Sequence, residues 1–255
     1  CQQVTVTVNP LPVAPTTATF MNKYVIKQQK LKIQNMQYYF EMKKTIVFFL
    51  IIPVICSGQI QFDFENHGIR EWTTDRLSSW DTSLMEPISG AISMKHIYDN
   101  PDAGHDQVSF CIDSLHPEAG MTEWHFRIRH GYDPSSSNNW SVFLIADADA
   151  TQMFPGGSAS GYAVGVNYFG SDDLLKLWKI DHGTGTPIIT TSLNWQEEIG
   201  TISAGIKVIR SAEGMWELLV NSQGSIFESI EKCYNQDLTR VCEFGVYYEY
   251  SSKQD

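Results

Sequence analysis

Apolar residues recur at every second position through most of the chain after residue 106. In 107–113 the apolar positions are Val108, Phe110 and Ile112; in 123–130, Trp124, Phe126 and Ile128 alternate with His125, Arg127 and Arg129. A repeat of two is typical of a β-strand with one buried and one wetter face. The same reasoning predicts strands at 140–146, 162–168, 174–180, 187–192, 205–211, 215–220 and 243–250. Long helical stripes are missing.

Clusters of Gly, Pro, Asn, Asp and Ser separate these strands, among them DPSSSNN, FPGGSASG, FGSDD and DHGTGTP. Such residues accept positive φ or pre-set a turn. We expect 205–220 to form a hairpin with Gly214 in its turn. Many short strands separated by such turn-forming clusters predict an all-β sandwich or jelly roll. No internal repeat of about 20 to 50 residues is visible, which disfavours a propeller or solenoid.

An apolar run from Ile46 to Cys56 breaks the pattern. It comes after Lys43 and Lys44 and ends in small residues, as a secretory signal peptide does, so we assign 42–58 to a signal peptide with cleavage after Gly58. The run is too short for a membrane span, which needs about 20 apolar residues. A buried core helix is the alternative. A lipoprotein signal through Cys56 is disfavoured because Pro, Val and Ile precede that cysteine.

The residues before this apolar run differ in character from residues 59–255. In 1–15, Val and Thr alternate before a proline-rich stretch, which predicts one strand and a linker that cannot fold alone. This part resembles the end of an immunoglobulin-like repeat of a bacterial surface protein. We interpret 16–41 as a linker or a mistranslated upstream region. The alternative is a genuine fusion with an internal signal anchor.

The net charge also differs between residues 1–58 and residues 59–255. Residues 59–255 hold 12 Lys plus Arg and 28 Asp plus Glu, a net charge of −16, whereas residues 1–58 carry +5, which gives −11 for the whole chain. So acidic a domain lacks the clustered basic residues that nucleic acid requires. It suits an exported protein and leaves acidic side chains for calcium. Its length suffices for one domain with a sizeable core.

Three cysteines come after the signal segment: Cys111, Cys233 and Cys242. Export would permit a disulfide, and the close pair Cys233 and Cys242 could bridge beside a hairpin. Buried free thiols are the alternative, since free cysteine is commonly a small core residue. No C-x-x-C pair and no zinc-type Cys/His spacing occurs in the sequence.

Several segments together carry a family resemblance: FDFE, PISGAISMKH, TEWHFRIRHGYDPSSSNNWSVFLIADADA, GYAVGVNYFGSDDLLKLWKI, IKVIRSAEGMWELLV and FGVYYEYSSKQD. They resemble a secreted domain of large bacterial surface proteins, often followed by lamin-tail or immunoglobulin-like modules. That domain is similar to concanavalin A-like and laminin-G-like jelly rolls. The resemblance covers nearly all of 60–255 and implies a two-sheet antiparallel β-sandwich for the domain at 59–255. It leads us to expect a further strand after Asp255, so that the domain is C-terminally truncated with an aggregation-prone sheet edge.

Catalytic patterns are not found in the sequence. Glycanases of this fold place paired acids along one strand in the spacing E-x-D-x-x-E, which is missing here. GGSASG lacks the G-x-S-x-G spacing, and GTGTP lacks the third glycine of a dinucleotide site. We therefore expect a non-catalytic domain, with a glycoside hydrolase using an unrecognised acid pair as a third possibility.

Acidic loops offer candidate calcium ligands, Asp147 with Asp149 and Asp172 with Asp173. Calcium takes several hard oxygens, which loop carboxylates and carbonyls supply, and laminin-G-like domains bind it at such a rim. Solvated turn acids are an equal alternative, because the EF-hand spacing is missing.

Aromatic and basic side chains suggest a ligand surface. Sugar-binding faces combine Trp or Tyr rings with polar side chains, and the candidates are Trp178 beside Lys176 and the outward set His125, Arg127 and Arg129. A strand Trp is more often core, because aromatic side chains bury large areas; we assign Trp124, Trp140 and Trp216 there.

Two functions fit these features. The first is a non-catalytic exported binding or adhesion domain that holds glycan or a matrix component within a larger cell-surface protein, with Ca²⁺ as an optional cofactor. The second is a structural spacer that carries other modules and binds no ligand. A binding domain should gather acidic and aromatic side chains on one face, whereas a spacer should not.

Overall fold

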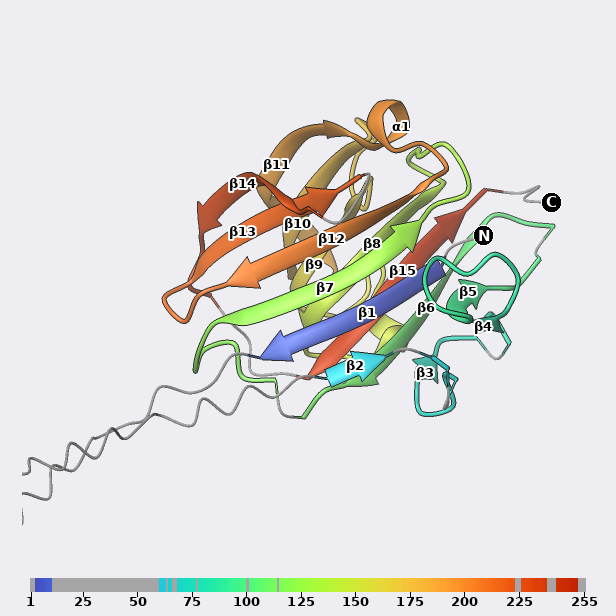
Figure 1. The fold of residues 1–255 in the computed structure, drawn as a ribbon, viewed down its shortest axis with the longest axis horizontal. Helices are drawn as coiled ribbons and strands as arrows, with labels where there is room; N and C mark the ends of the chain where they lie inside the picture. Colours follow the sequence, from blue (N-terminus) through green and yellow to red (C-terminus); the bar gives the residue numbers. More distant parts are fainter. Residues whose placement is uncertain are drawn as a thin grey trace, which may run out of the picture.

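The computed structural model describes residues 3–10, 60–62, 64–65, 68–76, 78–99, 101–113, 115–222, 226–237 and 242–251. Two antiparallel sheets lie face to face and form the predicted β-sandwich (Figure 1). The eight-stranded sheet has the order β14 (Glu228–Tyr234), β13 (Met215–Asn221), β12 (Ser203–Arg210), β7 (Thr122–Arg129), β1 (Gln3–Pro10), β5 (Ser93–His96) and β4 (Trp80–Ser83), with β2 (Ile60–Phe62) also beside β1.

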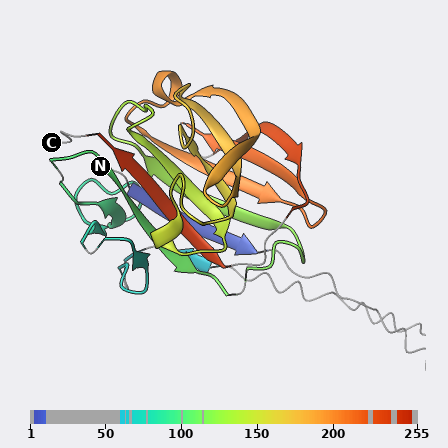
Figure 2. The same cartoon turned by 180° about the vertical axis from the view of Figure 1, so that it is seen from behind.

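The seven-stranded sheet has the order β11 (Thr184–Asn194), β10 (Leu174–Asp181), β9 (Gly161–Val166), β8 (Asn139–Ala146), β15 (Glu243–Tyr250), β6 (Gly104–Cys111) and β3 (Thr73–Thr74). Figure 2 shows this sheet from its outer side. The short helix α1 (Trp195–Glu198) comes directly after β11, and the 3₁₀ turn η1 (Ala150–Gln152) lies against β6 and β15. β15 is central in the sheet, with β6 and β8 along its two edges.

Each strand predicted from the period-two pattern is present, including the β12–β13 hairpin, in which Gly214 adopts a φ of 95°. Sequence reasoning missed β14 and the short strands β2 to β5. β14 is an edge strand whose residues are mostly exposed, so its sequence carries little apolar alternation. The short strands span two to four residues, too few to show a period.

The main core fills the space between the sheets. Trp124, Trp140 and Trp216 are fully buried there, as predicted. The rings of Trp124 and Trp216 stack at 5.8 Å within one sheet, and Tyr162 of the other sheet lies 4.5 Å from Trp216. Large aromatic surfaces therefore join the two sheets, and their removal from water stabilises the sandwich.

Strand β1 lies inside the eight-stranded sheet although residues 11–59 separate it from β2 (Figure 1). It pairs along its whole length with β7, and on its other edge with β5 and β2. The predicted linker at 16–41 and signal peptide at 42–58 lie outside the described residues. Among the described residues, no helix is long and apolar enough to cross a membrane. A further strand beyond Asp255 stays a prediction.

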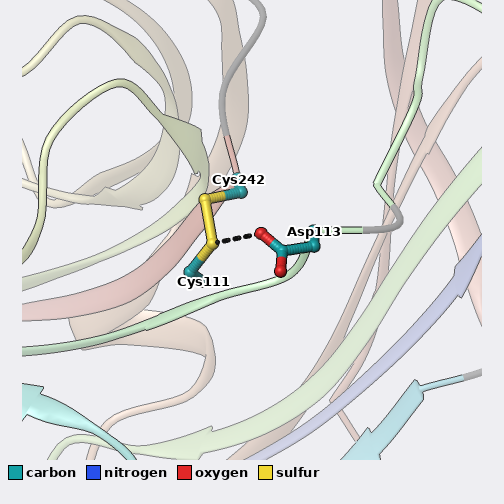
Figure 3. The surroundings of a disulfide bond; sticks show 3 residues. All are labelled: Cys111, Asp113 and Cys242. Atoms are coloured by element: carbon teal, nitrogen blue, oxygen red, sulfur yellow. Dashed lines mark hydrogen bonds between the residues drawn. A yellow bond between two sulfur atoms is a disulfide. The ribbon is translucent and has the colours of Figure 1, made fainter.

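The predicted bridge between Cys233 and Cys242 is wrong, because Cys242 is bonded to Cys111 (Figure 3). Pairing of β6 with β15 sets Cys111 opposite Glu243, so its Cα comes 4.8 Å from that of Cys242. Cys233 is a free thiol on β14 in the other sheet. Asp113 Oδ1 lies 3.0 Å from the Cys111 sulfur; since a disulfide sulfur carries no proton, this is a close contact and not a hydrogen bond.

Candidate functional site

A second buried cluster covers the outer side of the seven-stranded sheet, away from the main core. Its members come from the sheet and from the loops after β8 and β9: Phe143, Ala146, Met153, Ala159, Ala163, Tyr168, Trp178, Ile180 and Tyr247. An outer face of a sandwich is usually polar, alternating with the inner apolar face. This face is instead packed under loops, and polar groups of the sheet are enclosed there.

Four residues form a row across this face, which we call the polar row. The register sets Lys176 opposite Gly165, Gly165 opposite Ser141, and Ser141 opposite Tyr247. Their neighbours along the strands point into the main core, so these four project outward. A Cβ on Gly165 would clash with Ser141 Oγ, so only glycine lets the serine hydroxyl lie over β9.

Lys176 is buried in this row, with 6% of its surface exposed. Its ammonium group forms an ion pair with Asp172 and lies 5.2 Å from the centroid of the Trp178 ring. Both contacts offset the cost of burying a charge. Phe169 packs edge-on against the same Trp178 ring at 5.8 Å. The predicted residues Lys176 and Trp178 are therefore in contact. However, Phe169 packs on the Trp178 ring, and this residue is only 3% exposed.

The loop between β9 and β10 covers this face and is fixed at both ends. Asn167 Nδ2 donates to Asp173 Oδ1 at 2.6 Å, and the Asp173 backbone N–H donates to Asn167 Oδ1 at 2.9 Å. Asn167 and Asp173 have φ of 56° and 59°, a left-handed conformation that Asn and Asp tolerate better than most residues. The loop therefore holds Tyr168 and Phe169 over the sheet.

Tyr168 packs on Phe143 at 5.7 Å and on Tyr247 at 5.2 Å, and its hydroxyl is buried without a hydrogen-bond partner in the part of the chain that the structure describes. Burial raises the pKa of this phenol above its usual value. Ser141 Oγ, Trp178 Nε1 and Asn139 Oδ1 are also buried and have no hydrogen-bond partner among the described residues. Each such atom costs about 1–3 kcal/mol. Together they mark a place where polar groups of water or a ligand would be accommodated.

A hydrogen-bonded carboxylate flanks the row on β15. Glu249 Oε2 accepts from the Tyr247 hydroxyl and from Asn139 Nδ2, both at 2.8 Å. Burial, followed by the charge of Glu249, raises the pKa of Tyr247. His105, opposite Glu249 in the register, stacks on Phe154 at 4.9 Å. The outer face therefore offers donors, acceptors and aromatic rings side by side.

The other predicted ligand residues lie on the far side of the sandwich. His125, Arg127 and Arg129 project from the outer face of β7, in the eight-stranded sheet. His125 packs on Phe227 at 4.8 Å, Arg127 donates to Ser203 Oγ at 3.3 Å, and Arg129 donates to the Glu86 carbonyl at 2.6 Å. Burial lowers the pKa of His125, so its ring is neutral near pH 7. The structure does not bring this set near Lys176 and Trp178.

The four candidate calcium ligands lie at opposite ends of the β8–β9 pair. Asp147 accepts from the Ser160 backbone N–H at 2.6 Å, and Asp149 accepts from Thr151 at the start of η1. Asp172 and Asp173 are engaged by Lys176 and Asn167. Among the described residues, the one group of three that could offer metal ligands consists of Cys111, Cys242 and Glu243, two of which are disulfide-bonded. Neither aspartate pair belongs to such a group of three in the described part of the chain, and a calcium site there stays a prediction.

A charged cluster that sequence reasoning missed lies between the sheets. Asp106, fully buried on β6, lies 2.7 Å from His96 Nε2 and 3.0 Å from Arg76 Nε, and accepts from the Tyr250 hydroxyl at 3.0 Å. Desolvation raises the pKa of Asp75 nearby. The buried Asp106 carboxylate therefore has three polar partners, and a buried charge requires partners of this kind.

A cavity of about 610 Å³ opens beside β4, lined by Phe64, Glu65, Gly68, Ile69, Arg70, Glu71, Asp81, Thr82 and Ile92. Glu65 Oε1 accepts from the backbone N–H groups of Ala91 and Ile92, at 2.7 and 3.2 Å, and so closes one side. None of the predicted site residues lines this cavity.

Sequence reasoning missed Ser141, Gly165 and Tyr168 as members of the candidate site. Two signals were present in the sequence: a serine and a glycine at alternate positions of otherwise apolar strands, and two adjacent aromatic residues inside the turn cluster NYFGSDD. Aromatic residues in a turn indicate that the turn packs onto something.

Comparisons with known proteins concern the fold. No protein-family model and no curated protein matches the chain. Among solved structures, the exoplasmic/lumenal domain of VIP36 in its Ca²⁺/Man-bound form has a TM-score of 0.47 and 9% identity, over 71% of this chain and 77% of that one. The Emp46p carbohydrate recognition domain in its potassium-bound form has 0.45 and 11%, over 72% and 83%. The Emp47p carbohydrate recognition domain has 0.41 and 12%, over 68% and 81%.

Proposed function

We propose that the sandwich is a non-catalytic carbohydrate-binding domain whose binding surface is the polar row with Tyr168 and Glu249. The observation that carries this is the group of buried, unpaired polar atoms next to aromatic rings: Ser141 Oγ, Tyr168 Oη and Trp178 Nε1. Sugars present hydroxyl groups beside apolar C–H faces, so a site for them needs hydrogen-bonding atoms next to rings.

Access to the row requires the β9–β10 loop to move aside. Asp172, with 47% of its side chain exposed, forms the solvent edge of the loop, and a Cβ on Gly170 would contact nothing within 4 Å. A ligand hydroxyl that accepts from Lys176 would replace part of the Asp172 ion pair. The ligand therefore gains the hydrogen bonds that the unliganded row leaves unmade.

We propose an exported setting as well: a secreted or cell-surface domain of a larger multi-module protein that binds glycan or a matrix component. The signal-peptide pattern at 42–58 supports this. The Cys111–Cys242 disulfide agrees with it, since structural disulfides persist in oxidising compartments.

The test is a glycan-binding screen on the full chain, followed by the variant Tyr168→Phe. This change removes only the unpaired hydroxyl, so we expect binding to weaken by about 3- to 10-fold while the free energy of unfolding stays equal or rises. The matched control is Tyr234→Phe, at an exposed tyrosine of β14 in the other sheet. Equal weakening by both variants, or by neither, would remove the polar row as the binding surface.

Calcium enters as a separate arm of the same screen. Binding abolished by a chelator and restored by Ca²⁺ would support a metal-assisted site at the Asp147/Asp149 or Asp172/Asp173 loops. Binding that is insensitive to chelation would leave the polar row acting alone.

A structural spacer is the second candidate, favoured by one observation: the Lys176 ammonium group is already paired with Asp172 and packed against the Trp178 ring, without any ligand. A folded chain that binds no glycan in the screen would support this alternative.

A further inference from the structure

Strand β1 completes a sheet whose two parts have no other strand between them. The register places β7 along one edge of β1 over eight residues, from Gln3 opposite Arg129 to Pro10 opposite Thr122. On the other edge, β5 pairs with the first residues of β1, and β2 pairs with Val6 to Val8. In the described structure no ladder joins β7 directly to β5 or β2. Without β1, the sheet would therefore be split.

The walls of this gap are apolar on the core side. Positions 4, 6 and 8 of β1 each stand between two apolar partners, from β7 on one side and from β5 or β2 on the other. The partners are Ile128, Phe126 and Trp124 of β7, and Met94, Phe62 and Ile60. Directly opposed residues share a face of the sheet. The three positions that hold valine therefore belong to the core face.

The outer side of the gap is polar. Positions 5, 7 and 9 stand opposite Arg127, His125 and Glu123. The Arg129 guanidinium reaches the Glu86 carbonyl at 2.6 Å, from the end of β7 to the turn after β4. This contact joins the two parts of the sheet across the end of the gap without using the backbone of β1. The gap is therefore apolar on the core side and polar on the outer side, and the hydrogen bond from Arg129 to Glu86 spans one end of it.

The occupant is distant in the chain. Residues 11–59 separate β1 from β2, and the predicted signal-peptide cleavage after Gly58 falls inside that connection. Pairing of an extended segment with exposed strand edges is a known mode of peptide recognition, in which backbone hydrogen bonds give affinity and alternate side chains give specificity.

We propose that the gap between β7 and the β5/β2 pair is a strand-acceptor site, and that Gln3–Pro10 binds there as a separable ligand that stays in place when the connection through 11–59 is cut. The ligand chemistry is an extended segment of eight residues, antiparallel to its neighbours, with β-branched apolar residues at alternate positions. The inference is independent of the carbohydrate-binding proposal, since it concerns the opposite sheet.

The experiment uses the full chain with a protease site introduced between residues 16 and 41 and cleaved after folding. Size-exclusion chromatography and mass spectrometry then show whether the N-terminal fragment co-elutes with the domain. We expect it to co-elute, and to be displaced by a labelled synthetic peptide of residues 1–10 carrying Cys1→Ser. Near-ultraviolet circular dichroism checks that the domain stays folded.

Two further peptides test the face assignment. Val4→Thr, Val6→Thr and Val8→Thr together place hydroxyls at the positions that the register sets between apolar partners, and should weaken binding by at least about 30-fold, because a hydroxyl transferred into apolar surroundings is costly. Thr5→Ser with Thr7→Ser changes only outer positions and should bind within about threefold of the natural peptide.

Release of the fragment from a domain that keeps its spectrum would overturn the proposal, as would equal binding of the two variant peptides. A dimer that dissociates when the connection is cut would overturn it too, because the strand would then have been exchanged between two copies. Loss of the spectrum on release would overturn it as well, since the strand would then be neither retained nor separable from the fold.

Discussion

At the scale of single residues, the described domain buries polar groups whose protonation depends on the fold. His130 is fully buried at the end of β7, and burial lowers its pKa from 6.5 to about 3. The folded protein therefore holds this ring neutral at a pH where the unfolded chain would protonate it.

The histidine predicts a pH dependence of stability. Between pH 6.5 and about 3 the unfolded state binds a proton that the folded state does not, so the free energy of unfolding should fall as the pH falls. The loss is on the order of 1.4 kcal/mol per pH unit. Urea unfolding at pH 7, 5 and 4 should show a shallower decline for His130→Gln than for the natural chain. Parallel declines would contradict the assignment.

The candidate site also shows what residue-level reasoning can reach. Lys176 and Trp178 could be singled out because charge and aromaticity are visible in the sequence. Their burial could not be predicted, because it depends on Tyr168 and Phe169 in the preceding loop, which fold over the sheet. An outward strand position is exposed only if nothing folds over it.

At the scale of elements, the pairing of strands that are distant in sequence determines which cysteines form the disulfide. The short sequence spacing between two cysteines suggested the wrong pair. Cys233 and Cys242 are close in sequence, but β14 belongs to one sheet and β15 to the other. Cys111 and Cys242 are 131 residues apart and meet because β6 and β15 are neighbours. Sequence distance is a poor guide to contact in a sandwich, where most pairings are non-local.

We expect the Cys111–Cys242 disulfide to make a large contribution to the free energy of unfolding. Replacing Cys111 and Cys242 together by Ser should lower the free energy of unfolding by about 4–5 kcal/mol, because the cross-link closes a long loop in the unfolded chain. Reduction of the natural chain should have a similar effect in urea unfolding. Cys233→Ser is the control and should leave both stability and sensitivity to reductant unchanged. A reductant effect lost in Cys233→Ser would restore the alternative pairing.

At the scale of the whole molecule, aromatic packing joins the two sheets. Trp216 of β13 contacts Trp124 in its own sheet and Tyr162 in the other, and its Nε1 donates to the Asn235 carbonyl at 3.1 Å. The Arg210 guanidinium lies 5.5 Å from the same ring. One side chain therefore links both sheets and the segment after β14.

Trp216→Leu tests that link. We expect the free energy of unfolding to drop by about 3–4 kcal/mol, because a cavity opens between the sheets and the Asn235 carbonyl loses a donor. Chemical unfolding followed by circular dichroism measures the loss. A matched change in the second cluster, Tyr247→Phe, keeps the ring and should cost less. Equal losses would show that the inter-sheet contact is not special.

Local sequence patterns were enough to predict the class of fold and the long strands other than β14, because a half-buried β-strand has apolar and polar residues at alternate positions. They also identified the inward tryptophans Trp124, Trp140 and Trp216. Tertiary contacts settled the rest: which strands are neighbours, that Cys111 meets Cys242, that β1 completes the eight-stranded sheet, and that Lys176 and His125 face opposite sides. The physical reason is that register and sheet order arise from contacts between residues far apart in the chain. The local alternation of apolar and polar residues carries no information about those contacts.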